Sequence, residues 1–222
     1  FMIDADDHLR DFVERLTDDL EREAVYPEGA GVLARYAVLL LLVVIEGLFN
    51  ASFFAEGLST GLIGGFSYAA TLAMLNVVVM FLLGKSVLRW LFHRQAGLKL
   101  VGWLGLIGSL LYTTVVALAI AHLRTAILAA SAEPTKDAWA TLIYTPFALN
   151  DLLSWVLFLV TIGFGLAALL DGLFMDDLYP GYGELTRREK EAVDEFEDEF
   201  DDVRQDLEEL KQDNLDVLEQ EV

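Results

Sequence analysis

The chain has 222 residues, a mean hydropathy of +0.46 and a formal net charge of −20 at pH 7, so it is both apolar and strongly acidic. With 35 acidic residues against 15 basic ones, nucleic acid is not expected as a partner, because a nucleic-acid site needs a basic surface. The absence of cysteine excludes disulfides, thiolate nucleophiles and cysteine metal ligands.

Four long apolar runs dominate the chain, at residues 32–54, 61–83, 98–123 and 152–175. A helix of about 20 residues crosses a hydrocarbon core of about 30 Å, and each run is at least that long. The remaining chain is too short to bury four such runs in an ordinary soluble core. The sequence therefore predicts an all-α, polytopic integral membrane protein with four transmembrane helices and the lipid bilayer as its surroundings.

The charge lies at the two ends of the chain. Residues 1–31 carry ten acids and three arginines, residues 171–222 carry twenty acids and five bases, and residues 32–170 hold five acids and seven bases. We expect three regions: an acidic amphipathic helix and linker at 1–31, a membrane domain at 32–175 with an outer connector at 124–151, and a turn with an acidic helix at 176–222. A helical pattern still running at Val222 would fit a chain that is part of a longer protein.

Basic residues predict the orientation. The connection at residues 84–99 contains four bases and no acid, namely Lys85, Arg89, Arg94 and Lys99. Because bases prefer the cytoplasmic side of a membrane, we expect a multi-pass protein of the cell membrane with both termini in the cytoplasm.

The pattern of the N-terminal region predicts a short amphipathic helix with Leu9, Phe12, Val13, Leu16 and Leu20 on one face. Its polar face is acidic, whereas a helix lying on a membrane surface is usually basic. Packing against another part of the protein is the favoured interpretation.

The C-terminal region carries a heptad pattern. Its apolar positions alternate at spacings of three and four, at Val193, Phe196, Phe200, Val203, Leu207 and Leu210, with Asn214 at the next core position. This pattern predicts a cytoplasmic coiled-coil helix and a homo-oligomer. The alternative is a helix that packs once against the chain's own N-terminal helix.

A few polar residues interrupt the apolar runs. Asn50 follows Glu46 one turn later on the same face of the first span. Counting along the helices places Thr113 and Thr161 at a depth similar to that of Glu46, with Asn76 deeper, towards the cytoplasmic side. A carboxylate inside a membrane is costly, so Glu46 is a functional candidate. It could line the pore of an oligomer, accept a proton, or hold helices together as a neutral hydrogen-bonding group.

Catalytic and metal-binding motifs are not found. The sequence has no GxSxG, HExxH or phosphate-binding glycine loop, and its three histidines are far apart. We therefore expect no enzyme activity, no cofactor and no metal.

Three segments carry a family resemblance: NASFFAEG at 50–57, LIGG at 62–65 and DDLYPGYG at 176–183. Through them the chain resembles a group of uncharacterised prokaryotic four-span membrane proteins. The resemblance implies the four-span fold and brings no activity with it.

Two functions remain open from the sequence. The leading expectation is an oligomeric, channel-like or membrane-perturbing assembly with Glu46 near its permeation path. The alternative is a non-conducting membrane anchor or scaffold that recruits a cytoplasmic protein through its acidic helices. A proton-coupled transporter is disfavoured, because the four runs show no inverted repeat.

Overall fold

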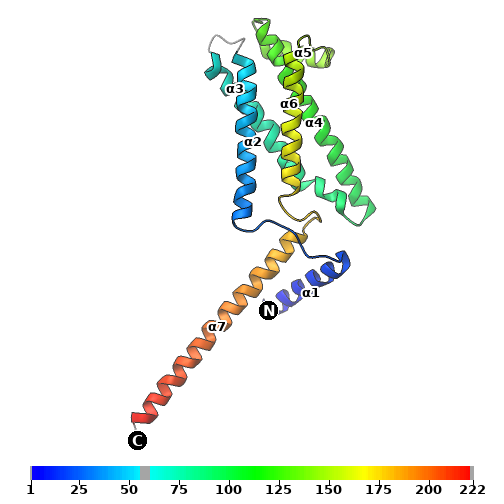
Figure 1. Cartoon of the computed structure of the whole chain (residues 1–222). Helices are drawn as coiled ribbons and strands as arrows, with labels where there is room; N and C mark the ends of the chain where they lie inside the picture. The colour runs from blue at the N-terminus through cyan, green and yellow to red at the C-terminus, as the bar shows by residue number, and fades with distance from the viewer. Residues whose placement is uncertain (1, 56–60, 221–222) are drawn as a thin grey trace. The chain divides into compact units, whose positions relative to one another are not determined.

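The computed structural model describes residues 2–55 and 61–220, and the side chains of residues 8–55, 66 and 69–212. These residues form helices and connecting turns, with no strand among them. The elements, shown in Figure 1, are α1 (Met2–Leu20), α2 (Ala30–Ala55), α3 (Gly61–Ser86), η1 (Leu88–Phe92), α4 (Ala96–Leu128), α5 (Pro134–Tyr144), α6 (Leu152–Leu173) and α7 (Tyr182–Gln220).

The chain divides into two compact units. Residues 25–180 form the first, here called the membrane unit, and residues 1–24 with 181–222 form the second, here called the acidic unit. Each unit has its own contacts and is described separately below.

Four helices of the membrane unit are long and apolar enough to cross a membrane, which confirms this part of the prediction. The helices α2, α4 and α6 have 26, 33 and 22 residues. At 1.5 Å per residue, even α6 reaches about 33 Å, which exceeds the thickness of the hydrocarbon core. In the second span, the apolar stretch Ala69–Phe92 runs from α3 into η1.

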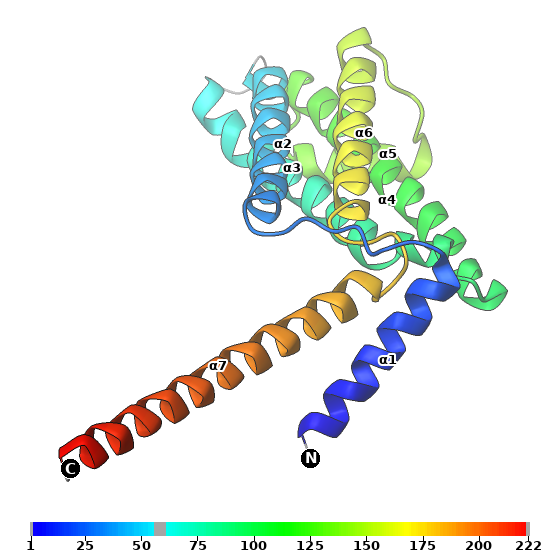
Figure 2. The same ribbon diagram turned by 60° about the horizontal axis from the view of Figure 1, so that its bottom comes forward.

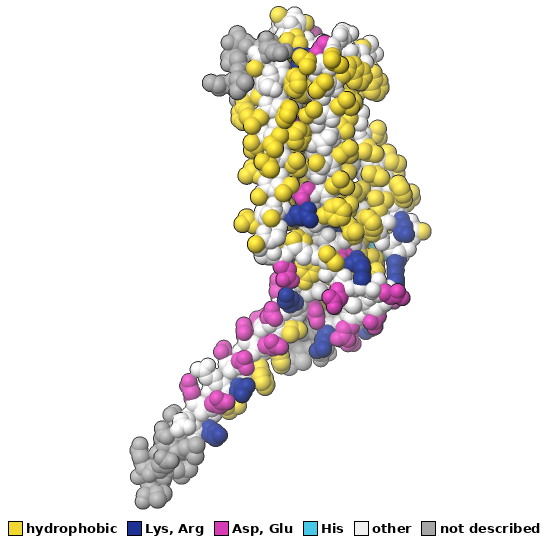
Figure 3. Space-filling view, viewed as in Figure 1, with side chains coloured by type: hydrophobic (Ala, Val, Ile, Leu, Met, Phe, Trp, Pro, Cys, Tyr) yellow, Lys and Arg dark blue, Asp and Glu magenta, His cyan; other side chains and the backbone are white. Residues whose placement is uncertain are grey.

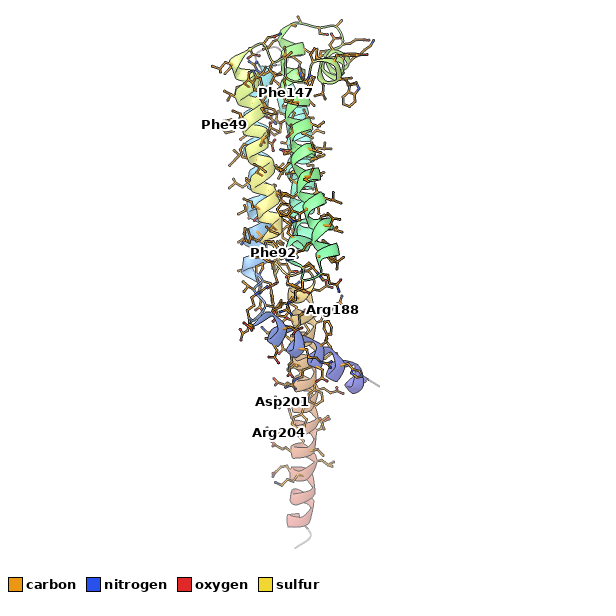
Figure 4. All side chains as sticks on the ribbon, turned by 90° about the vertical axis from the view of Figure 1, so that its right-hand side faces the viewer. Phe49, Phe92, Phe147, Arg188, Asp201 and Arg204 are labelled. Carbon is orange, nitrogen blue, oxygen red and sulfur yellow. The ribbon has the colours of Figure 1, made fainter. Side chains whose placement is uncertain are left out.

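Many large apolar side chains lie on the outside of the membrane unit, and small ones are among those buried inside it. Leu104 and Leu159 are 61% and 63% exposed, whereas Ala73, Ala117 and Ala168 are fully buried. Hydrophobic side chains cover the face of this unit that Figure 3 shows. Phe49, labelled in Figure 4, is about half exposed on α2. This arrangement is typical of a helical bundle in lipid, where small residues let helices approach closely.

The closest approach of α3 and α6 depends on two glycines. A Cβ atom added at Gly84 of α3 would collide with the carbonyl oxygen of Leu169, and one added at Gly172 of α6 would collide with that of Phe81. The two helix backbones therefore touch, and neither position has room for a side chain.

In the acidic unit, α1 packs against the start of α7. The Tyr182 ring is 1% exposed, and its hydroxyl lies 2.7 Å from the Thr17 hydroxyl and donates to the Arg22 carbonyl oxygen at 2.9 Å. The guanidinium of Arg22 stands 5.6 Å from the centre of the same ring. In Figure 2, the C-terminal end of α1 lies near the N-terminal end of α7, and the two helices diverge from there. The prediction that α1 packs on another part of the chain is confirmed.

Gly172→Ala should destabilise the membrane unit, because the new methyl group must push α3 and α6 apart. We expect a loss of about 1–3 kcal/mol, the usual cost of overpacking. Thermal unfolding in detergent measures it. The matched control is Gly163→Ala on the same helix, where an added Cβ meets nothing within 4 Å. Equal melting temperatures for the two variants would contradict the backbone contact.

Candidate functional site

Asn76 joins four helices in the middle of the membrane unit. Its side-chain amide nitrogen donates to Glu46 Oε1 and to the Thr161 carbonyl oxygen, both at 3.0 Å. Its amide oxygen accepts a hydrogen bond from Thr113 Oγ1 at 3.3 Å. One side chain on α3 thus reaches α2, α4 and α6, and we call these residues, with Asn50, the polar cluster.

All five residues predicted as an intramembrane polar site are buried. Glu46, Asn50, Asn76 and Thr161 are 0% exposed and Thr113 is 1% exposed. The structure brings Glu46, Asn76 and Thr113 together through side-chain hydrogen bonds, and Thr161 joins them through its backbone.

The expectation that Asn76 lies deeper than Glu46 is wrong, since the two side chains are hydrogen-bonded. Counting along the sequence assumed that α2 and α3 meet the membrane surface at the same height. Glu46 comes eight residues before the predicted end of its span, and Asn76 fifteen residues after the start of the next. The two helices are therefore offset by about two turns.

Several polar atoms of the cluster have no hydrogen bond within the described part of the chain. They are Glu46 Oε2, both amide atoms of Asn50 and Thr161 Oγ1. Gly165 on α6 leaves room for the cluster, because a Cβ there would collide with Thr113 Oγ1 and lie 3.1 Å from Asn76 Oδ1. The centre of the bundle is therefore polar, closed and only partly hydrogen-bonded.

Ion pairs hold the end of the membrane unit where α2 begins and α6 ends. Arg35 donates to Asp171 at 3.1 Å, and Arg89 donates to Asp176 at 3.3 Å. Asp171 lies near the end of the fourth span, yet its side chain is only 6% exposed and is paired with an arginine of the first span. The reason is the antiparallel arrangement, which brings the start of α2 beside the end of α6.

The other end of the unit has a buried arginine. Arg124 of α4 is 2% exposed and donates to Asp151 at 2.7 Å and to the Ser154 hydroxyl at 3.2 Å. Asp151 also caps α6, accepting the Ser154 backbone N–H at 3.1 Å. Partial burial raises the pKa of Asp151, but the hydrogen bonds from Ser154 and the Arg124 guanidinium outweigh this and hold that pKa below its usual value. Asp151 therefore remains charged opposite Arg124.

The turn after α6 uses the aspartates of the DDLYPGYG segment. Asp177 is 2% exposed, and its carboxylate accepts the backbone N–H of Val25 at 2.8 Å and that of Tyr179 at 2.7 Å. The Tyr179 ring stacks on His93 with centroids 5.3 Å apart. Within the membrane unit, these contacts tie the turn after α6 to the backbone before α2 and to the end of η1.

The apolar side chains predicted for oligomerisation lie uncovered on α7. Val193 is 39% exposed, and Phe196, Phe200, Val203, Leu207 and Leu210 are between 53% and 62% exposed. We call these six residues the α7 stripe. Asn214 lies outside the residues whose side chains the structure describes. Charged side chains surround the stripe, among them Asp201 and Arg204, which Figure 4 labels.

Comparison with family models, curated proteins and solved structures finds no match to the chain in any of the three. Function must therefore be inferred from the polar cluster and the α7 stripe.

Thr113→Val should destabilise the membrane unit by about 1 kcal/mol, because it removes the hydrogen bond that the Thr113 hydroxyl donates to the buried Asn76 oxygen. The neighbouring Thr114 provides the control, since its hydroxyl bonds only within α4, to the Leu110 carbonyl oxygen. Thr114→Val should change the melting temperature much less. If the two variants melt alike, the polar cluster does not contribute to helix packing.

Proposed function

We propose that this chain is a membrane anchor that assembles with protein through the α7 stripe. The membrane unit holds the chain in the bilayer, and α7 supplies the contact surface. One observation carries the proposal: six large apolar side chains lie exposed along one face of an otherwise charged helix.

The composition of α7 indicates that its stripe faces water. Residues 181–222 contain 17 acids and five bases, which is not the surface of a helix that lies in lipid. In water, fully burying a Leu, Phe or Val side chain is favourable by about 1.5–3 kcal/mol. A contiguous row of such side chains on a charged helix is typical of a protein contact surface.

The polar cluster supports an anchor more than an oligomeric pore. Glu46 is 0% exposed within a single chain, enclosed by α2 and its neighbours. A ring of carboxylates around an axis between chains would instead require Glu46 on the outer surface of the unit. An ion pathway remains the second candidate function, because the buried atoms Glu46 Oε2 and Thr161 Oγ1 have no hydrogen bond to the residues that the structure describes, and each could receive an ion or water.

The basic residues between the second and third spans support a cytoplasmic position for the acidic unit. Lys85, Arg94 and Lys99 lie at the end of the membrane unit from which α1 and α7 continue, and bases favour the cytoplasmic side. The partner of α7 would then be a cytoplasmic surface.

The combined change Phe200→Asp and Leu207→Asp should reduce the mass of the particle extracted from membranes, because each charge would be buried in the contact. Mass photometry or light scattering in detergent measures this. The control adds the same two charges outside the stripe, as Gln205→Asp with Gln212→Asp, and should leave the mass unchanged. A particle of unaltered mass in the stripe variant would overturn the proposal.

Proteoliposomes of the wild type should show no ion flux over the background of empty liposomes, because the anchor needs no pathway. Glu46→Gln should leave both flux and melting temperature nearly unchanged, since the amide keeps the shape of the side chain and its bond to Asn76. A wild-type flux that falls in Glu46→Gln would establish the second candidate function instead.

A further inference from the structure

We infer that the partner of the α7 stripe is a second copy of this chain, with the two α7 helices parallel and in register. The inference rests on the proposed function and names its partner. It is carried by charge complementarity that the heptad pattern creates between identical helices.

The stripe follows the heptad without interruption. With Val193 at position a, the a positions are Val193, Phe200, Leu207 and Asn214, and the d positions are Phe196, Val203, Leu210 and Val217. The same count places the buried Tyr182 at an earlier d position, where α1 covers it. Thr186 and Glu189 occupy the a and d positions between Tyr182 and Val193, so the exposed apolar seam begins at Val193.

The two basic residues beyond position 190 lie where a parallel partner needs them. Arg204 and Lys211 are the only bases in residues 191–222, and both occupy e positions. In a parallel pair, each g side chain faces the e side chain five residues further along the partner helix. Glu199 at g would face Arg204 of the second copy, and Asp206 at g would face Lys211 of the second copy. Twofold symmetry doubles these two pairs to four.

An antiparallel pair would lose this match. It brings g positions opposite g positions, and Glu199, Asp206 and Asp213 at g are all acidic. Like charges in direct contact disfavour that arrangement. Most of the remaining acids do not oppose the parallel one, because positions b and c point away from the seam and hold seven of them: Asp194, Glu195, Asp201, Asp202, Glu208, Glu209 and Asp216.

The contact that Arg204 makes within its own helix does not compete strongly with pairing. Arg204 lies 3.5 Å from Glu208, and both side chains are more than two-thirds exposed. Exposed pairs of this kind contribute little, so the guanidinium can turn to a partner. Asn214 at an a position adds a reason for a dimer in fixed register, since buried asparagines pair with each other there.

Single cysteines test the geometry, because the 222-residue sequence contains no cysteine of its own. Phe196→Cys and Leu210→Cys both place a thiol at a d position, fourteen residues apart. In the parallel arrangement, mild oxidation should cross-link each variant to a dimer in most molecules. Gln205→Cys, at the outward f position, is the control and should remain largely uncross-linked.

Charge reversal tests the ionic pairs. Arg204→Glu with Lys211→Glu should weaken self-association by about tenfold, because four attractions become repulsions. Glu199→Lys with Asp206→Lys should weaken it similarly. An equimolar mixture of the two variants should recover association as a mixed dimer, in which every g and e pair is again of opposite charge.

The outcomes separate this inference from the function on which it rests. Cross-linking at only one d position, or at neither, in a particle whose mass still depends on the stripe would overturn the parallel register and leave the anchor proposal standing. Mixed variants that fail to recover association would overturn the ionic pairing. A particle mass independent of the stripe would overturn both.

Discussion

The bundle depends on the hydrogen bonds of Asn76. Lipid tails are as apolar as leucine, so helices in a bilayer gain little from bringing apolar faces together. Close packing and polar contacts must hold them instead. Asn76 supplies contacts to three other helices at once, and Gly165 leaves the space in which they form. The direct backbone contact at Gly84 and Gly172, about two turns from Asn76 along α3, fixes α3 against α6.

The sequence predicted the spans well because length and hydropathy are properties of each segment alone. It also selected the polar residues of the cluster, since a carboxylate or amide within an apolar run is costly wherever it points. It could not predict that Asn76 is the partner of Glu46, because the vertical offset of α2 and α3 is a property of the packed pair. Depth counting failed at that residue for this reason.

Arg124 and Gly172 show a second limit of the sequence. The sequence placed Arg124 at the start of the outer connector at 124–151, but α4 continues to Leu128 and carries it into the bundle beside Asp151. Gly172 was one glycine among 17, and nothing in its neighbourhood marks it as the place where two backbones meet. Such contacts depend on crossing geometry, which periodicity does not encode.

The two units differ in which kind of side chain is costly to expose, because one faces lipid and the other faces water. In the membrane unit, polar side chains are the ones that are costly to expose to lipid, and the unit buries them, with Glu46 and Asn50 at 0% exposure. In the acidic unit, apolar side chains are the ones that are costly to expose to water. Here α1 packs on Tyr182, but the α7 stripe stays exposed. Because α1 and α7 diverge beyond their contact, α1 does not cover the stripe (Figure 2). Under the proposed function, this difference separates two roles: the closed unit would hold the chain in the bilayer, and the open one would assemble it with protein.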